Sequence, residues 1–180
     1  MDTNKAPLIW LDMEMTGLNP EQCLPVEVAV IVTDAELNEL DHFEAVIHQS
    51  EEAMAHMDDF VRNMHTENGL LKKVEASKTT LAEADAGLAE CLKKHIGKRE
   101  GVLAGNSIHA DRAFIKNYFP KVEELLHYRM VDVSTFKELV KRWYGEDEIF
   151  KKANKHTAMA DIRESLGELA HYRKRFWKTF

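Results

Sequence analysis

The spacing of apolar residues predicts a strand-rich first part of the chain and a helix-rich remainder. Three apolar runs lie before residue 48, and turn sequences at residues 16–20 and 34–38 separate them. β-branched apolar runs bounded by short turns are typical of consecutive strands. We therefore predict a three-stranded meander, with strands at about residues 8–15, 26–33 and 40–47.

From residue 50 onward, apolar residues recur three and four positions apart, which predicts helices. Ser50 is a typical cap for the first of them, and Thr80 and Thr135 are each followed three residues later by Glu, the spacing of a capping box. Pro120 is expected to end a helix. The predicted elements are short helices at about 58–64 and 70–74, a long helix at 80–96, a strand at 102–104, a helix at 110–119, a strand at 128–133, a helix opening at 135, and a last helix from 157 onward.

The order of these elements predicts the fold class. Strands that alternate with helices pair in parallel, whereas the meander is antiparallel, so the two together predict a mixed sheet flanked by helices. The 180 residues fit one domain and contain no repeat, low-complexity tract or linker. We predict a single α/β domain over residues 1–180.

Charge and composition exclude some classes of partner. The net charge is −7, from 24 basic and 31 acidic side chains, which argues against an extended basic surface for long or duplex nucleic acid. A short polyanion held at a metal site remains compatible with this balance. Two isolated cysteines favour a reducing compartment, and no stretch approaches a membrane span or a secretory signal. We expect a cytoplasmic protein with no membrane contact.

The clearest chemical signal is a pair of acids in the first predicted strand. Asp12 and Glu14 lie two positions apart in an apolar run, so their side chains point to the same face. Two carboxylates about 5 Å apart repel by roughly 3 kcal/mol at an effective dielectric near 20. A proton or a cation is needed to offset that repulsion, and Mg²⁺ or Mn²⁺ prefers oxygen ligands.

Two other interpretations of this pair stay open at this point. The first is ordinary solvated polarity at the end of a strand. The second is a nucleophile loop, because Asp-x-Glu-x-Thr resembles that of haloacid-dehalogenase-like phosphatases, in which the second acid is normally Asp. Further acids and a base at usable spacings would distinguish these interpretations from a metal site.

Two later acids and a histidine supply what the pair lacks. Asp111 begins a predicted helix just after a short strand, and Asp161 lies in the first turn of the last helix, five residues beyond His156. Each acid alone could be a partner of the helix dipole. Together they match a two-metal phosphoryl-transfer site, in which carboxylates hold ions about 3.5–4 Å apart and a base takes a proton from water.

These residues resemble the three motifs of the DEDDh superfamily of 3′-to-5′ exonucleases. The matching strings are Asp12-x-Glu14, Asp111 within Gly-Asn-Ser-Ile-x-x-Asp-Arg-x-Phe, and His156-x-x-x-x-Asp161. The flanking strings are similar to those of the oligoribonuclease family, at residues 8–18, 127–129, 132–135 and 161–165. The resemblance runs from about residue 8 to 176, the expected core of a single exonuclease domain.

The resemblance implies a fold, an activity and a set of catalytic residues. It implies a ribonuclease H-like mixed five-stranded sheet and 3′-to-5′ removal of nucleotides from single-stranded RNA two to five nucleotides long, especially dinucleotides. The cofactors implied are two divalent ions, Mg²⁺ or Mn²⁺. By position, the metal ligands are Asp12, Glu14, Asp111 and Asp161, and the general base is His156.

The resemblance also implies substrate contacts and a homodimer. Leu18 resembles an apolar wedge between two bases, and Phe60 stands where the family often has a stacking Trp. Tyr128 resembles a residue contributed across a dimer, which implies composite sites. The residues that match positions near the phosphates are His65, Ser107, Arg129 and Ser134. Ala160 departs from the family, since it replaces the first acid of a frequent Asp-Asp pair and leaves Asp161 in place.

Three alternatives to a short-substrate exoribonuclease remain at the level of the sequence. One is a proofreading-type DNA exonuclease or a ribonuclease that trims structured RNA, against which the acidic balance counts. Another is a catalytically silent RNA-binding or scaffold protein, although all five catalytic positions are filled. The phosphatase would predict an aspartyl-phosphate at Asp12 and would leave the motifs at Asp111 and Asp161 unexplained.

Overall fold

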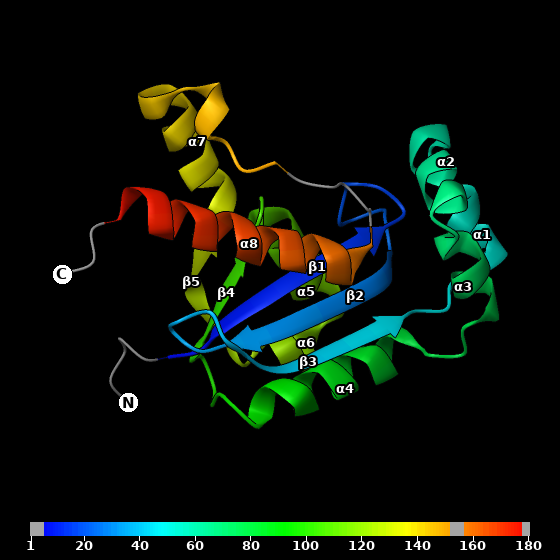
Figure 1. Cartoon of the computed structure of the whole chain (residues 1–180). Helices are drawn as coiled ribbons and strands as arrows, with labels where there is room; N and C mark the ends of the chain where they lie inside the picture. Colours follow the sequence, from blue (N-terminus) through cyan, green and yellow to red (C-terminus); the bar gives the residue numbers. More distant parts are fainter. Residues whose placement is uncertain (1–5, 152–156, 178–180) are drawn as a thin grey trace.

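A five-stranded mixed sheet forms the centre of the protein (Figure 1). The computed structural model describes residues 6–151 and 157–177. The strand order is β3-β2-β1-β4-β5, so the sheet combines the predicted antiparallel meander with the predicted parallel portion. The strands are β1 (Leu8–Met15), β2 (Pro25–Thr33), β3 (Glu39–Val46), β4 (Gly101–Gly105) and β5 (Leu126–Asp132).

The pairing directions fix which residues lie opposite each other. β1 is antiparallel to β2 and parallel to β4, and β5 extends the parallel half beside β4. In the β1–β2 pair, Asp12 lies opposite Ala29 and Glu14 lies opposite Glu27. The C-terminal ends of the three parallel strands therefore meet at one edge of the sheet, where loops and helix starts gather.

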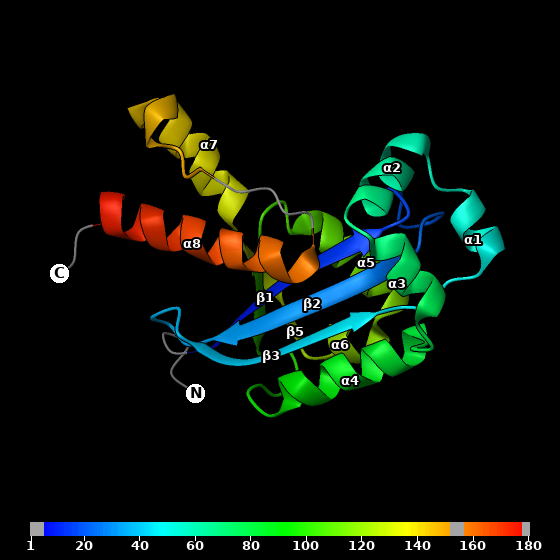
Figure 2. The same ribbon diagram turned by 45° about the vertical axis from the view of Figure 1, so that its right-hand side comes forward.

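Helices cover both faces of the sheet (Figures 1 and 2). On one face, α7 and α8 bury Trp10 of β1; on the other, α4, α5 and α6 bury Ile9 and Leu11. The alternation along β1 continues to Asp12 and Glu14, which follow Trp10 onto the face of α8. The helices are α1 (Glu51–Ala55), α2 (Asp59–Glu67), α3 (Leu70–Ala76), α4 (Leu81–Lys93), α5 (His109–Tyr118), α6 (Pro120–Glu123), α7 (Val133–Tyr144), the 3₁₀ turn η2 (Glu146–Glu148) and α8 (Ala158–Phe176).

A group of short helices, α1 to α3, lies at the end of the sheet beyond β2 and β3 (Figure 1). A small separate core attaches it, formed by Val26, Leu70 and Val74. α2 also places His65 against β1, because the His65 Nε2–H donates to the Met15 carbonyl at 3.0 Å. This group therefore borders the edge at which Asp12 and Glu14 lie.

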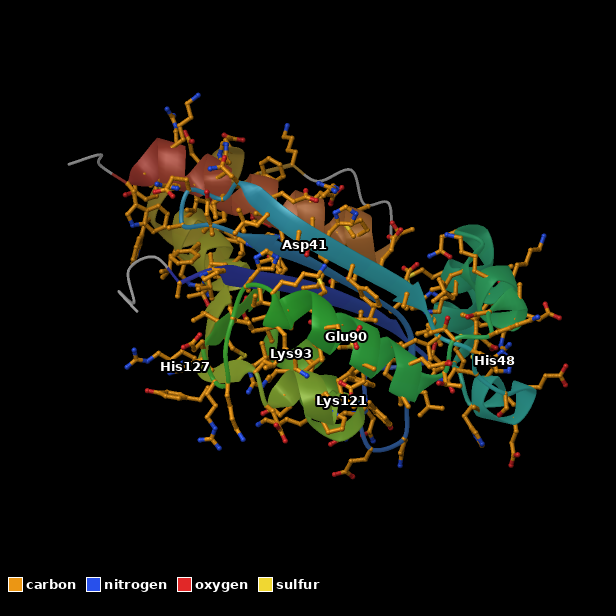
Figure 3. The ribbon with its side chains drawn as sticks, turned by 90° about the horizontal axis from the view of Figure 1, so that it is seen from below. Asp41, His48, Glu90, Lys93, Lys121 and His127 are labelled. Atoms are coloured by element: carbon orange, nitrogen blue, oxygen red, sulfur yellow. The ribbon has the colours of Figure 1, made fainter. Side chains whose placement is uncertain are left out.

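The face of the molecule that α4 covers carries charged side chains of both signs (Figure 3). Asp41 on β3 accepts hydrogen bonds from Lys94 Nζ at 3.0 Å and His95 Nε2 at 3.2 Å, which join the sheet to the end of α4. Glu90 and Lys93 of α4 are exposed on this side. None of the helices in residues 6–151 and 157–177 is long and apolar enough to cross a membrane.

The predicted strands and helices are confirmed, apart from a few residues at their ends. Ser50 and Thr80 cap helices as expected. The predicted start at Thr135 is wrong: α7 begins at Val133, and the Asp132 side chain caps it by accepting from the Ser134 N–H at 2.9 Å. Pro120 follows α5 as expected but also opens α6, since proline needs no partner for the N–H it lacks.

Candidate active site

Three of the predicted acids converge near the C-terminal end of β1, at the end of the sheet where the carboxyl ends of the parallel strands meet. Asp12 and Glu14 come from β1, and Asp161 comes from the first turn of α8. One carboxylate oxygen from each of these residues lies within 4.8 Å of the others. Oxygen donors at this spacing fit a hard divalent cation, so the residues present are suited to the implied metal.

Asp111 lies beside this group on the first turn of α5. Its side chain is buried, and its Oδ1 accepts a hydrogen bond from the backbone N–H of Met13 at 3.1 Å. That bond ties α5 to the strand segment between Asp12 and Glu14. Burial, opposed by backbone hydrogen bonds, raises the pKa of Asp111 to about 7.

Burial and crowding make Glu14 an unusually weak acid. Its pKa rises from an ordinary value of 4.5 to about 8, first because of burial and then because of the charges of Asp161, Glu27 and Asp111. Such a carboxylate holds a proton at neutral pH unless a positive charge replaces it. The electrostatics of the site therefore favour a cation, in agreement with the geometry of the oxygen atoms.

His65 is wholly buried between α2 and the acids. Its Nε2 donates to the Met15 carbonyl, and its Nδ1 lies 3.8 Å from Oε2 of Glu14. Among the residues that the structure describes, Nδ1 has no hydrogen-bond partner. The sequence placed His65 near the phosphates; in the structure its ring borders the metal-ligand candidate Glu14.

Ser107 and Ser134 are neighbours at the ends of β4 and β5. The Ser107 N–H donates to Ser134 Oγ and to Asp132 Oδ1, both at 3.0 Å, and the two hydroxyl oxygens lie 3.3 Å apart. Ser107 has a φ of 49°, a left-handed conformation that serine seldom adopts. The shared hydrogen bonds hold this strained backbone in place. They also place the two hydroxyl groups at the same end of the sheet as the acids.

The side chain of Asn106 connects these hydroxyls to α8. Its Oδ1 accepts from Ser134 Oγ at 3.1 Å, while its Nδ2 donates to Ser165 Oγ at 2.7 Å and to Oε2 of the buried Glu168 at 3.1 Å. Ser165 in turn donates to the carbonyl of Asp161 at 2.9 Å. One amide therefore links the hydroxyl pair with the helix that carries an acid of the site.

The remaining predicted substrate contacts are exposed. Leu18 follows β1 with 85% of its surface exposed, Phe60 on α2 is 78% exposed, and Tyr128 on β5 is 74% exposed. The guanidinium carbon of Arg129 lies 5.5 Å from the centre of the Tyr128 ring, within the range of a cation–π contact. His156, the predicted base, lies outside the described residues.

The sequence did not single out three side chains that contact the site, namely Glu27, Asn106 and Glu168. Glu27 had a recognisable signal, since it is the only acid in the most strand-like apolar run of the chain. Asn106 lay inside a quoted motif without a role. Glu168 had no signal, because a charged residue on a long helix is usually exposed.

Comparison with known proteins places the chain in a family. The family model described as exonuclease (RNase_T) matches residues 9–169. Oligoribonuclease of Thiobacillus denitrificans is 46% identical over 98% of both chains. That of Chromobacterium violaceum is 49% identical over 99% of this chain and 98% of its own.

Solved structures share the fold at much lower identity. A structure of exonuclease I superposes with a TM-score of 0.75 at 14% identity, and covers 95% of this chain and 41% of its own. Exonuclease I from Methylocaldum szegediense superposes with a TM-score of 0.72 at 16% identity, and the match covers 95% of this chain and 41% of that protein. This chain thus spans about two fifths of those proteins, and the likeness confirms the predicted ribonuclease H-like fold. With a family match over residues 9–169 and relatives nearly half identical along their whole length, the chain belongs to the oligoribonuclease family of exonucleases.

Proposed function

We propose that this protein is a metal-dependent exoribonuclease that removes mononucleotides from the 3′ end of RNA two to five nucleotides long, especially dinucleotides. Family membership gives the 3′-to-5′ exonuclease activity on short oligoribonucleotides. The observation that carries the metal dependence is the convergence of Asp12, Glu14 and Asp161 within 4.8 Å. We further propose that residues 1–180 act as one exonuclease domain in the cytoplasm.

The acids would hold two divalent ions, Mg²⁺ or Mn²⁺. Asp12, Glu14 and Asp161 supply the oxygen cluster, and the buried Asp111 adds a fourth carboxylate beside it. When bound, such ions lower the pKa of water and stabilise the charge of the leaving 3′ oxygen. The protein's own part is to hold the four carboxyl groups close together in a partly buried site, where bound cations would take the place of the protons that burial favours.

His156 is the proposed general base. The support is its place in the sequence, two residues before the first residue of α8 and five before Asp161. An imidazole titrates near neutrality, so it can take a proton from water and release it again at physiological pH. It would accept the proton of the attacking water at its unprotonated ring nitrogen.

The substrate would lie across the exposed apolar residues and the hydroxyl pair. Leu18 and Phe60 offer apolar and aromatic surface for bases, with Phe60 giving a smaller stacking face than the Trp frequent in the family. Ser107, Ser134 and Arg129 offer hydroxyl and guanidinium donors for phosphate oxygens. Capping a terminal phosphate in this way would explain a preference for very short RNA.

A homodimer is part of the proposal. Tyr128 projects from the edge strand β5, which, among the strands that the structure describes, pairs only with β4. An exposed aromatic residue on an open edge is typical of a contact surface. In the proposed dimer, Tyr128 of each protomer completes the site of its partner.

The function is tested by cleavage of a 5′-labelled RNA dinucleotide with Mg²⁺ or Mn²⁺. We expect rapid release of mononucleotide by the wild type, loss with a chelator, and a rate about 100-fold or more lower for His156→Ala, as for removal of a general base. Glu90→Gln, which removes an exposed acid on α4 at the far side of the sheet, is the matched control and should cleave like the wild type. Survival of the dinucleotide while a long RNA or DNA is trimmed would contradict the substrate proposal and leave the metal site intact.

A further inference from the structure

Glu27 is a buried acid on β2, an inner strand of the sheet between β3 and β1. It is 8% exposed, and Val26 and Val28 on either side are fully buried. Its direct cross-strand neighbour is Glu14, another buried acid. Like charges in this relation destabilise a sheet, and burial makes the cost larger. A carboxylate at this position therefore needs a compensating contact.

The compensating contact is the start of α8. Glu27 Oε2 accepts a hydrogen bond at 3.0 Å from the backbone N–H of Ala158, the first residue of that helix. The N–H groups of a first turn lack partners within the helix, and its positive end favours a carboxylate. Within the described residues, the Thr157 side chain accepts no hydrogen bond from this turn, so the cap comes from β2.

This contact bears directly on Asp161. The Asp161 N–H donates to the Thr157 carbonyl at 3.0 Å, so Ala158 and Asp161 belong to the same turn. β2 pairs with β1, which carries Asp12 and Glu14. Glu27 thus joins the turn that bears one acid to the strand that bears the other two.

We infer that Glu27 is a positioning residue of the metal site: its hydrogen bond to Ala158 holds the first turn of α8 against β2 and so sets the place of Asp161 relative to Asp12 and Glu14. The inference rests on the proposed function, since the metal site is part of it. It assigns Glu27 no contact with metal or RNA. Its action depends on the acceptor oxygen and not on the charge, which gives a clear test.

The test compares two substitutions of similar size. Glu27→Gln keeps an oxygen that accepts from Ala158, whereas Glu27→Met fills the space with a thioether that is only a weak acceptor. The control is Glu44→Gln, which removes an exposed acid from the neighbouring strand β3. Mn²⁺ affinity is measured by calorimetry without RNA, and amide hydrogen exchange of the first turn of α8 is measured without metal.

We expect Glu27→Gln and Glu44→Gln to bind Mn²⁺ within about threefold of the wild type. Glu27→Met should bind at least tenfold more weakly, exchange the Ala158 and Asp161 amides faster, and regain activity as Mn²⁺ is raised. Thermal unfolding confirms that each variant is folded at the assay temperature, and Glu27→Ala replaces Glu27→Met if the latter does not fold.

The outcomes that overturn the inference differ from one another. Wild-type affinity in folded Glu27→Met would show that the contact only stabilises the fold. An equal loss of Mn²⁺ affinity in Glu27→Gln and Glu27→Met would show that the negative charge of Glu27 supports metal binding, and not its hydrogen-bond acceptor. Absence of Mn²⁺ binding by the wild type itself would contradict the proposed metal site, and the positioning role with it.

Discussion

At the scale of single residues, the site is defined by carboxylates held where water cannot easily stabilise their charge. Glu14 and Asp111 are both buried, and each has a raised pKa. In the free protein they bind protons at a pH where the unfolded chain has released them. That difference couples the stability of the fold to pH in a direction opposite to that of a salt-bridged acid.

We predict that the metal-free protein becomes less stable as pH rises through neutrality. Between 4.5 and about 8, folded Glu14 keeps a proton that the unfolded chain loses, so each rise in pH favours unfolding. One such proton corresponds to roughly 2–3 kcal/mol between about pH 6 and 8. Chemical unfolding in the presence of a chelator measures the free energy of unfolding at each pH. The slope of this free energy against pH should be smaller for Glu14→Gln, and smaller for the wild type in saturating Mn²⁺. A stability that rose with pH over this range would contradict the burial of the protonated acid.

The sequence predicted part of this residue-level picture. Asp12 and Glu14 share a face because strand periodicity is local, and Asp161 lies in a first turn as the pattern indicated. Opposition of Glu14 and Glu27 depends on the register of two strands, and burial of His65 depends on how α2 meets β1. Neither relation is local in the chain, so periodicity could not reveal it.

At the scale of elements, β5 passes directly into α7. The strand ends at Asp132 and the helix begins at Val133, so no loop separates them. The sequence of Thr135 and Glu138 has capping-box spacing, but the strand's last residue already provides the cap. A cap motif indicates where a helix could begin. Here the position at which β5 leaves the sheet determines where α7 begins.

We predict that Asp132, and not Thr135, stabilises the start of α7. Asp132→Ala removes an acceptor shared by the N–H groups of Ser134 and Ser107, and should lower the free energy of unfolding by about 1–2 kcal/mol. Thr135→Ala, at an exposed position inside the helix, should change it by less than about 0.5 kcal/mol. Urea unfolding of both variants measures the two changes in free energy. A larger loss for Thr135→Ala than for Asp132→Ala would contradict the role of Asp132 as the cap.

At the scale of the whole molecule, the fold gathers distant segments at one end of the sheet. The acids come from β1, α5 and α8, and the hydroxyls follow β4 and β5 (Figures 1 and 2). The alternation of strands and helices predicted the parallel half of the sheet, and the family resemblance implied that these acids share one site. The alternation of strands and helices did not itself fix the strand order that makes them meet.

We predict subunit complementation between two inactive variants. If Tyr128 completes the partner's site, a mixed dimer of Tyr128→Ala with Asp12→Asn contains one site with an intact set of acids and an intact Tyr128. Co-expressed chains with two different tags, purified for the mixed dimer, should regain about half of the wild-type rate on a dinucleotide, since one of two sites is whole. A mixed dimer of the expected mass that stays inactive would place Tyr128 in its own protomer's site.

The late position of α8 in the chain has a consequence for synthesis. β1 is made early, and Asp161 is added only after all five strands. A growing chain could complete its sheet and still lack both the third acid of the oxygen cluster and the helix turn that binds Glu27. If the proposed metal site is the catalytic one, hydrolysis can begin only after translation has passed Asp161 and α8 has packed, and the nascent chain is inactive until then.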